Sequence, residues 1–290
     1  VVSNPEFLRE GAGIEDFMRP NRIVIGTSSD QATAIMKDLY RPLYLIETPI
    51  VITDVKTSEL IKYASNAFLA TKISFINELA NLCETVGANV QTVAKGMGLD
   101  RRIGPKFLHA GPGYGGSCFP KDTLALLQIG KENNVNLGII SATIKSNEYQ
   151  KQKAADTILN VVEKPKGKTI CILGLSFKPN TNDIRDAPAL YIINKLQKAG
   201  VKIRAFDPVA MEDAKAFLTK VTYCNDAYDA AKGADAIVIV TEWNQFRNLD
   251  LNKLKKLVKG KFFFDLRNIY EPERLTKMGF KYYSTGRAQR

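Results

Sequence analysis

The chain contains little histidine, tryptophan and cysteine. Its 290 residues include one histidine, one tryptophan and four cysteines. With His109 as the only histidine and no cluster of ligand residues, the sequence argues against a bound metal. The cysteines lie far apart and form no Cys-x-x-Cys pair, which indicates a reducing, cytoplasmic setting. They are Cys83, Cys118, Cys171 and Cys224.

Long apolar runs are also missing. No run approaches membrane-spanning length and no signal peptide is visible, so we expect no membrane partner. The hydrophobic content of 45% is ordinary for a globular protein, and the length suggests about two domains. A net charge of +11 would suit an anionic partner, either nucleic acid or a phosphorylated small molecule. The densest basic run, Lys253 to Lys261, lacks interleaved aromatics, which argues against nucleic acid.

The first part of the chain lacks a Gly-x-Gly-x-x-Gly segment after any predicted strand. Residues 1–54 are typical of α/β fragments, with strands at 22–26 and 50–52 and a helix at 29–40. The chain begins Val1-Val2-Ser3, which resembles the tail of a strand, and has no initiator methionine. We therefore expect it to be the C-terminal part of a longer protein.

The middle of the chain is predicted to be helical from 55 to 164. Apolar residues recur at three- and four-residue steps from Ser58 to Val86, which predicts a long helix with Ser58 as its cap. Shorter helices are predicted at 90–97, 121–133 and 137–163, around a loop at 104–116 that is rich in glycine and proline. Such helical blocks often form dimer interfaces, so we expect a homodimer through these helices.

The last part of the chain, 165–290, begins after the basic turn Lys164–Lys168. Strands are predicted at 169–174, 202–206, 236–240 and 262–265, with a helix at 189–199. Alternating strands and helices predict a Rossmann-like domain with a parallel sheet, so the fold class is α/β with a helical centre. Ligands bind such sheets at the carboxyl ends of the strands, which here indicates 175–178, 241–243 and 265–268.

The segment Gly115-Gly-Ser-Cys118-Phe-Pro120-Lys121-Asp122 has the pattern of a reactive thiol. Pro120 suits the first position of a helix, and a helix N-terminus together with Lys121 would favour the thiolate of Cys118. One helical turn would bring the Asp122 carboxylate alongside the thiol. The alternative is a small buried cysteine in a tight turn.

Other polar groups form weaker patterns. Glu6 and Glu10 are four residues apart and could serve proton transfer or bind a sugar, or form an exposed acidic turn. Lys62 and Asn66 share a helix face, either as an oxyanion site or as a polar stripe. Near strand ends, Lys178, Arg185 and Arg267 could bind phosphate or ribose groups, or form surface salt bridges.

Together these segments occur in the order found in the nucleotide-sugar 6-dehydrogenases of the UDP-glucose/GDP-mannose dehydrogenase family, and the chain resembles that family over essentially all 290 residues. The Ser-Cys-Phe-Pro-Lys-Asp form favours UDP-glucose over UDP-N-acetylmannosamine and, on one Phe/Leu difference, over GDP-mannose. The motifs that carry the resemblance are Asn4-Pro-Glu-Phe-Leu-Arg-Glu-Gly11, the Lys62/Asn66 helix, Gly113-Tyr-Gly-Gly-Ser-Cys-Phe-Pro-Lys-Asp122, Gly174-Leu-Ser-Phe-Lys178 and Asp265-Leu-Arg-Asn268.

The resemblance implies oxidation of a sugar C6 alcohol to an acid in two NAD-dependent steps, here UDP-glucose to UDP-glucuronate, a precursor of polysaccharides. Cys118 would capture the C6 aldehyde as a thiohemiacetal, whose oxidation gives a thioester that water hydrolyses. Asp122 would position or activate the water, Lys62 and Asn66 would stabilise the oxyanion, and Glu6 is the candidate acid/base.

The resemblance also implies the residues that bind the ligands. Arg102 would cross to the nucleotide sugar of a partner subunit. The implied substrate-binding residues are Phe7, Leu8, Arg9, Glu10, Arg102, Phe107, Tyr114, Gly115, Lys178 and Arg267. The implied NAD-binding residues are Glu10, Lys121 and Arg185.

The chain departs from the family at its start. Family members begin with a complete NAD-binding Rossmann domain, whose glycine-rich turn would here precede Val1, so residues 1–54 are expected to be the C-terminal remnant of that domain. A polypeptide of these 290 residues is therefore expected to be inactive, while still dimerising and binding UDP weakly. The alternatives are a dehydrogenase of GDP-mannose or another nucleotide sugar, or a non-catalytic nucleotide-sugar-binding or dimerisation fragment.

Overall fold

The chain divides into two compact units, Val1–Phe68 and Leu69–Arg290. The computed structural model describes residues 1–46 and 48–288, and the division falls within the long helix α3 (Val55–Val86). None of the helices in these described residues combines the length and hydropathy that a bilayer crossing needs. The predicted division into domains 1–54, 55–164 and 165–290 stays a prediction.

The first unit is built on a two-stranded parallel sheet, β1 (Ile23–Gly26) and β2 (Ile50–Thr53), with Ile23 beside Ile50. Helix α2 (Asp30–Leu39) begins at Ser29, whose side chain accepts a hydrogen bond from the Ala32 amide at 3.2 Å. These elements confirm the strands and the helix that were predicted. The unit also contains α1 (Gly13–Met18) and the 3-10 helix η1 (Arg41–Ile46), which were not predicted.

The start of α3 differs from the prediction. Ser58 was expected to cap the helix, but the helix begins three residues earlier, and Asp54 accepts a hydrogen bond from the Thr57 amide at 2.9 Å. The hydrogen bonds from Thr57 lower the pKa of Asp54. Ser58 is instead fully buried and donates to the carbonyl of Ser3 at 3.2 Å. Asp54 therefore caps the helix N-terminus, the role that was predicted for Ser58.

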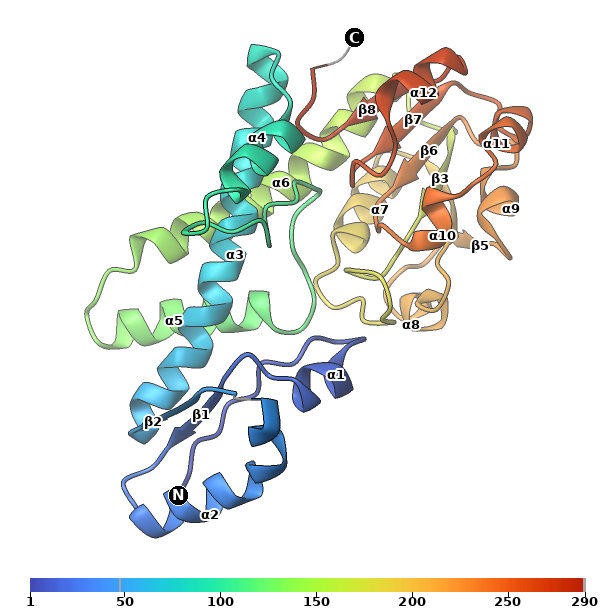
Figure 1. Cartoon of the computed structure of the whole chain (residues 1–290). Helices are drawn as coiled ribbons and strands as arrows, with labels where there is room; N and C mark the ends of the chain where they lie inside the picture. Colours follow the sequence, from blue (N-terminus) through green and yellow to red (C-terminus); the bar gives the residue numbers. More distant parts are fainter. Residues whose placement is uncertain (47, 289–290) are drawn as a thin grey trace. The chain divides into compact units, whose positions relative to one another are not determined.

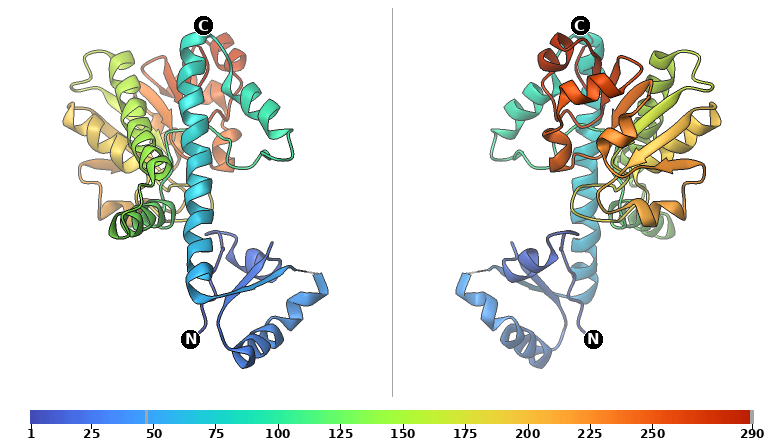
Figure 2. Two further views of the ribbon diagram at one scale, coloured as in Figure 1. Left: turned by 90° about the vertical axis from the view of Figure 1, so that its left-hand side faces the viewer. Right: turned by 90° about the vertical axis from the view of Figure 1, so that its right-hand side faces the viewer.

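Three further helices of the second unit confirm the predicted helical middle of the chain. They are α4 (Val90–Gly98), α5 (Phe119–Glu132) and α6 (Gly138–Val162). Figure 2 shows α3 as a single continuous helix, in agreement with the apolar period of three and four residues. The end of α3 and the start of α4 share a small apolar cluster that includes Ile76, Ala80 and Val90.

The second unit contains a six-stranded parallel sheet in the order β5-β4-β3-β6-β7-β8 (Figure 1). The chain builds the sheet outward from β3 to β5, then returns to lay β6 beside β3. The order of strands reverses there, and ligands of open α/β sheets bind at such a point. The strands are β3 (Thr169–Leu173), β4 (Lys202–Phe206), β5 (Val221–Tyr223), β6 (Ala236–Ile239), β7 (Phe262–Asp265) and β8 (Lys281–Ser284).

Helices cover both faces of this sheet. Alternate residues of β3 point to opposite faces, so Ile170 and Ile172 pack in one apolar cluster while Cys171 and Leu173 pack in the other. The first cluster contains residues of α6 and of α7 (Pro188–Lys198). The remaining helices are short and were not predicted: α8 (Met211–Lys215), α9 (Ala227–Ala231), α10 (Asn244–Arg247), α11 (Leu251–Leu257) and α12 (Pro272–Lys277).

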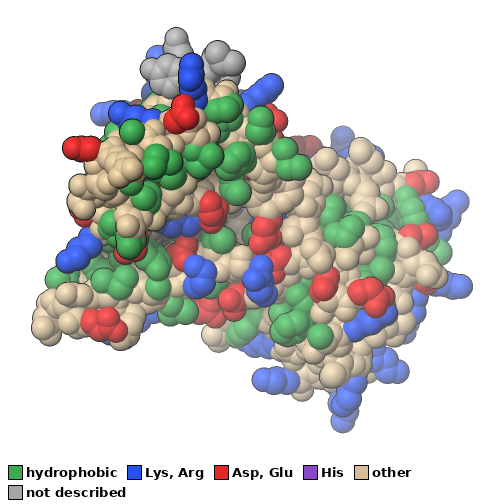
Figure 3. All heavy atoms as spheres, turned by 90° about the horizontal axis from the view of Figure 1, so that it is seen from below, with side chains coloured by type: hydrophobic (Ala, Val, Ile, Leu, Met, Phe, Trp, Pro, Cys, Tyr) green, Lys and Arg blue, Asp and Glu red, His purple; other side chains and the backbone are tan. Residues whose placement is uncertain are grey.

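The excess of positive charge is not gathered on the face drawn in Figure 3. There, Lys and Arg side chains are interspersed with acidic and apolar ones. In α11, the Lys253 ammonium lies over the ring of Tyr228, 4.0 Å from the ring centre.

Candidate active site

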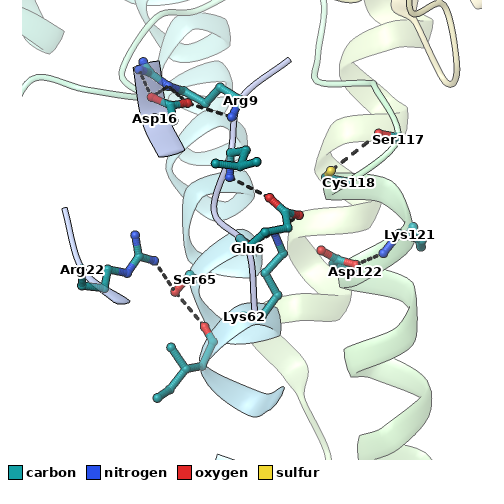
Figure 4. Close-up of polar contacts among 12 residues, drawn as sticks. Glu6, Arg9, Asp16, Arg22, Lys62, Ser65, Ser117, Cys118, Lys121 and Asp122 are labelled. Atoms are coloured by element: carbon teal, nitrogen blue, oxygen red, sulfur yellow. Dashed lines mark hydrogen bonds and ion pairs between the residues drawn. The ribbon is translucent and has the colours of Figure 1, made fainter. Parts of the chain in front are cut away.

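In the first unit, two predicted site residues form an ion pair (Figure 4). The Lys62 ammonium donates to the Glu6 carboxylate at 2.8 Å and to the Glu6 carbonyl at 2.5 Å. The side chain of Lys62 is only 18% exposed, whereas that of Glu6 is 56% exposed. Lys62 therefore holds the backbone as well as the carboxylate of Glu6, although the Glu6 side chain remains exposed, as in the alternative of an exposed acidic turn.

Phe7 is fixed by a stacked arginine. The guanidinium carbon of Arg22 lies 3.4 Å from the centre of the Phe7 ring, and Arg22 also donates to the Ser65 hydroxyl of α3 at 3.4 Å. Burial lowers the pKa of Arg22. The Phe7 ring is thus held against the same helix that carries Lys62.

The side chain of Arg9 is engaged within the first unit. It forms an ion pair with Asp16 of α1 at 2.6 Å, and the Arg9 amide donates to the same carboxylate at 2.8 Å. The hydrogen bond and the charge of Asp16 raise the pKa of Arg9. Leu8 is exposed, whereas Asn66 is buried on α3. The amides of Leu8 and Arg9 are likewise engaged, donating to Glu6 at 2.7 Å and to Asp16 at 2.8 Å.

In the second unit, Cys118 occupies the N-cap position of α5, one position closer to the helix than the sequence predicted. Its sulfur lies 3.5 Å from the Ser117 hydroxyl, and its carbonyl accepts the Asp122 amide at 2.8 Å. Pro120 stands at the second helical position, one residue later than predicted, because α5 begins at Phe119. Lys121 forms an ion pair with the carboxylate of Asp122, whose side chain is nearly buried.

The other three cysteines lie in the interior. Cys83, Cys171 and Cys224 are buried, whereas Cys118 is partly exposed, and all four are free thiols. Burial raises the pKa of Cys171 and of Cys224. Partial exposure at a helix N-terminus distinguishes Cys118 from a small buried cysteine in a turn, which was the alternative interpretation.

The loop before Cys118 is held by buried amide side chains of two helices. Asn147 of α6 accepts from the Tyr114 amide at 2.8 Å and donates to the Tyr114 carbonyl at 3.1 Å. Asn77 of α3 accepts from the Gly111 amide at 2.8 Å, and Gln150 of α6 donates to the Gly111 carbonyl at 2.9 Å. Four hydrogen bonds therefore fix a loop that has no secondary structure of its own.

The same loop lies against the carboxyl ends of the parallel strands. The Gly116 amide donates to the carbonyl of Arg185 at 2.7 Å, and a Cβ on Gly116 would lie 2.8 Å from the Phe177 ring. A Cβ on Gly111 would lie 3.0 Å from the Arg267 guanidinium. The loop that leads to Cys118 thus meets the segments after β3 and β7, where sequence reasoning placed the ligand site.

Arg267 lies at the end of β7 and is oriented by main-chain oxygens. It donates to the carbonyl of Val240 at 2.7 Å and forms an ion pair with Glu242 at 3.0 Å. Its own amide donates to the buried Asp265 carboxylate at 3.1 Å, which also accepts the Tyr282 hydroxyl. Burial raises the pKa of Asp265.

A cavity of about 650 Å³ opens beside the start of α5. Its charged lining includes Lys121, Lys151 and Arg185, together with Glu148 and Asp186. Two of the predicted NAD-binding residues, Lys121 and Arg185, therefore face one space. Arg185 is also paired with Asp183 at 2.9 Å.

Two further predicted residues lie between α4 and α5. Arg102 forms an ion pair with Asp100 at 2.6 Å, and its side chain is 88% exposed. Phe107 has a positive φ of 65°, and its ring lies 6.0 Å from that of Phe119, the first residue of α5. Tyr114 packs edge-on against Phe119 from the same distance of 6.0 Å. The aromatic cluster Phe107, Tyr114 and Phe119 thus supports the start of the Cys118 helix.

Comparison with known proteins places these features in one family. Three models of the UDP-glucose/GDP-mannose dehydrogenase family match the chain: the NAD binding domain at residues 1–44, the central domain at 56–149 and the UDP binding domain at 171–272. The chain belongs to this family. It is 53% identical over 290 residues to a UDP-glucose 6-dehydrogenase of Rhizobium meliloti (strain 1021), with 99% of the chain and 66% of that relative covered. It is 50% identical over 288 residues to a UDP-glucose 6-dehydrogenase of Bacillus subtilis (strain 168), with 99% of the chain and 62% of the relative covered.

The fold of the dehydrogenase family is likewise shared. A UDP-glucose dehydrogenase from the archaeon Pyrobaculum islandicum matches with a TM-score of 0.90 and 37% identity, over 99% of this chain and 64% of that one. The chain therefore spans slightly less than two thirds of the length of these family members. The α/β fold class and the family were both predicted from the sequence and are confirmed.

The sequence did not predict the residues that hold the loop before Cys118 and the carboxyl ends of the parallel strands. Asp207 is fully buried and accepts from the amides of Leu175 and Ser176 at 2.7 and 3.2 Å and from the Trp243 indole at 3.1 Å. An Asp-Pro pair directly after a strand and the chain's single tryptophan were the available signals. Asn77, Asn147 and Gln150 gave no such signal, because an amide within a helix is common and its partners are more than 30 residues away.

Proposed function

We propose that this chain carries the thiol and the nucleotide-sugar site of an NAD-dependent UDP-glucose 6-dehydrogenase, which converts UDP-glucose to UDP-glucuronate. The observation that carries the proposal is the placement of Cys118 at the N-terminus of α5, behind a loop that meets the carboxyl ends of β3 and β7. The match to the family's UDP binding domain and the names of the relatives support it.

The nucleotide sugar would bind at the mouth of the parallel sheet. Lys178 and Arg267 supply positive charge at the ends of two strands, and an arginine presents a planar donor pair that suits a diphosphate. Glycines at 115 and 116 let the loop pack closely on the segment after β3, since a side chain there would meet the carbonyl of Asp186 or the ring of Phe177. These features favour a phosphorylated small molecule over nucleic acid as the anionic partner.

The Cys118 sulfur would form a covalent bond to C6 of the sugar. Loss of a first hydride from C6 and of the hydroxyl proton gives the aldehyde, and addition of the thiol to it gives a thiohemiacetal. Loss of a second hydride from C6 together with the hydroxyl proton gives a thioester, and attack by water releases the carboxylate and restores the thiol. Asp122, one turn along α5, would take a proton from that water. In this scheme Lys62 and Asn66 stabilise the oxyanion and Glu6 acts as acid or base. The ion pair between Lys62 and Glu6 in the first unit supports a shared role for these two residues.

NAD would accept the two hydrides that leave C6. In the second unit, Lys121 and Arg185 both line the cavity beside α5 and are the residues that we propose for contact with the cofactor. Residues 1–44 match the family's NAD binding domain. Glu10, in the first unit, is the remaining residue that we propose for contact with the cofactor.

The test uses a protein in which the N-terminal part of a family NAD-binding domain is joined ahead of Val1, so that residues 1–44 complete that domain. We expect two NADH per UDP-glucose, and a loss of turnover of ~10³-fold or more for Cys118→Ser, since a missing nucleophile removes the covalent path. Cys83→Ala, at a thiol buried in the α3–α4 cluster, is the matched control and retains turnover. Undiminished turnover by Cys118→Ser would contradict the proposal, and turnover with GDP-mannose but not UDP-glucose would support the sister activity instead.

A polypeptide of residues 1–290 is proposed to bind the nucleotide sugar without oxidising it. Within the described residues, no glycine-rich turn joins a strand to a helix in the first unit, so the cofactor's diphosphate lacks its usual helix N-terminus there. Formation of NADH from UDP-glucose by this polypeptide would disprove the idea. The free thiols fit a reducing cytoplasm, and the product would serve polysaccharide biosynthesis.

A homodimer through the central helices is proposed from the exposed side of α3. Phe75, Leu82 and Val86 are 45%, 55% and 64% exposed and recur at steps of seven and four residues, which places them on one face of the helix. Large apolar side chains in such a row favour a protein contact. Sedimentation analysis should give a dimer for the unaltered chain and a monomer for Phe75→Glu/Leu82→Glu; a monomer in both cases would refute the interface.

A further inference from the structure

The last described residues of the chain form a strap that binds the loop of Arg267. This C-terminal strap, Thr285–Arg287, follows β8 and packs on the loop Leu266–Tyr270, which we call the arginine loop. The Thr285 hydroxyl donates to the carbonyl of Leu266 at 3.2 Å, and Arg287 donates to the carbonyl of Tyr270 at 3.3 Å. The Asn268 side chain closes the contact by donating to the Thr285 carbonyl at 2.9 Å.

The other side of the C-terminal strap binds the central helices. The Gly286 amide donates to the Glu84 carboxylate of α3 at 2.8 Å, and the Gly286 carbonyl accepts from the Val90 amide of α4 at 2.9 Å. A Cβ on Gly286 would lie 2.7 Å from that of Ala80, so the strap fits closely against α3. In Figure 1 the segment after β8 accordingly runs to the start of α4.

Gln91 joins the two sides directly. Its side-chain NH2 donates to the carbonyl of Asn268 in the arginine loop at 3.1 Å, while its side-chain oxygen accepts from the Arg287 guanidinium. Thr285 and Arg287 are both at least nine-tenths buried. One amide on the first turn of α4 therefore contacts the strap and the arginine loop at the same time.

Asn268 connects this contact to the substrate arginine. Asn268 follows Arg267 in the chain and has a positive φ of 55°, so its backbone is held in a conformation that few residues adopt freely. The Asn268 carbonyl lies one peptide beyond Arg267, so a shift of it would move the backbone that carries the Arg267 side chain and would alter the direction of the guanidinium, which is aimed by the carbonyls of Val240 and Phe177.

We infer that Gln91 and Arg287 are positioning residues for Arg267, and that the C-terminal strap thereby sets the affinity for the nucleotide sugar. The inference rests on the proposed function, because it requires Arg267 to contact UDP-glucose. Gln91 and Arg287 act through the arginine loop and touch no substrate themselves.

The test is UDP-glucose binding by calorimetry to the 290-residue chain carrying Gln91→Glu. This change keeps an acceptor for Arg287 but replaces the donor to the Asn268 carbonyl by a second oxygen, so we expect affinity to fall by ~5-fold or more. Gln152→Glu, at an exposed glutamine of α6, introduces the same charge and should bind as the unaltered chain does. In the Arg267→Ala background, Gln91→Glu should have no further effect, because coupled residues are not additive.

Hydrogen exchange of the arginine loop gives a readout that does not depend on ligand. The amides of Arg267 and Tyr270 donate to Asp265 and should exchange faster in Gln91→Glu, but not in Gln152→Glu. Arg287→Lys, which keeps the charge and loses the planar donor pair, is the second variant and is measured in the same way if Gln91→Glu does not fold.

The outcomes separate the inference from the proposed function. Unchanged affinity and exchange in Gln91→Glu, or full additivity with Arg267→Ala, would overturn the inference. If Arg267→Ala binds UDP-glucose as well as the unaltered chain, the substrate role of Arg267 is wrong and the inference is wrong with it. If the unaltered chain does not bind UDP-glucose, the proposed function fails first, and that result is seen before any variant is compared.

Discussion

Asn147 holds Tyr114 through both ends of one side-chain amide. The Tyr114 amide donates to the Asn147 oxygen at 2.8 Å, and the Asn147 nitrogen donates back to the Tyr114 carbonyl at 3.1 Å. Asn147 is 2% exposed, so water does not replace either bond. The pair fixes the backbone four residues before Cys118 and therefore determines where the thiol is presented.

Asn147→Leu should lower the free energy of unfolding by about 2–4 kcal/mol. The leucine fills the same space but leaves the N–H and the C=O of Tyr114 buried without partners, at about 1–3 kcal/mol each, partly relieved by adjustment of the loop. Urea unfolding followed by circular dichroism measures the change. Asn160→Leu, at an exposed asparagine of the same helix, should change stability by less than about 0.5 kcal/mol. Equal effects at both positions would contradict the role of Asn147.

Gly116→Ala should destabilise the chain and displace the Cys118 loop. Gly116 has φ = +83°, and an added Cβ would lie 2.8 Å from the Phe177 ring, so both the backbone and the packing oppose a side chain. We expect a loss of about 1–3 kcal/mol in the free energy of unfolding. Gly96→Ala is the control, because Gly96 lies inside α4 with nothing near its Cβ position, and it should stabilise by about 0.5–1 kcal/mol. A neutral Gly116→Ala would show that the loop is not closely packed on Phe177.

Stability should fall between pH 10 and pH 12 through Tyr114. Burial raises the pKa of this phenol from its usual 10.0 to about 12. Over that interval the unfolded state loses the Tyr114 proton while the folded state keeps it, so rising pH favours unfolding by as much as about 2 kcal/mol. Below pH 10 the contribution is constant. Unfolding free energies at pH 9 and pH 11 should differ less in Tyr114→Phe than in the unaltered chain; an identical pH dependence in both would refute the assignment.

Asp207→Asn should weaken the mouth of the sheet and can be followed through one fluorophore. Both Asp207 oxygens accept hydrogen bonds from N–H groups. One accepts from the Leu175 amide at 2.7 Å and the Trp243 indole at 3.1 Å, and the other accepts from the Ala210 amide at 2.9 Å. In an asparagine, the NH2 group would therefore face an N–H in either orientation. A loss of about 2–4 kcal/mol is expected. Trp243 is the only tryptophan, so the emission of the folded chain should change as well. Asp213→Asn, at an exposed carboxylate of α8, should leave the emission unaltered.

Much of the fold was predictable because the signals are local. The apolar period of α3, the apolar runs of β3 and β6, and Pro120 at the start of α5 each report on residues within a few positions of one another. The glycines before Cys118 were also informative, since positive φ and close approach are needed at Gly116. These residues predicted the elements correctly, whereas the reactivity of Cys118 stays a prediction.

The supports of the site could not be read from the sequence for a physical reason. Asn77, Asn147 and Gln150 bind backbone groups 33 to 39 residues away, and such pairings depend on how helices pack after they form. The strand β8 has few apolar residues, so its pairing with β7 left no clear pattern. Ser58 was mistaken for a cap because Asp54, four residues earlier in the chain, caps the helix instead.

The distribution of the thiols has a practical consequence for spectroscopy. Three of the four sit inside apolar clusters or between helices, and only Cys118 reaches solvent. A haloacetamide dye added to the folded chain should therefore react at Cys118 alone, and mass spectrometry should detect one adduct without any engineered cysteine. The label would sit at the helix end where the sugar is proposed to be held, so the natural sequence already contains its own probe of occupancy.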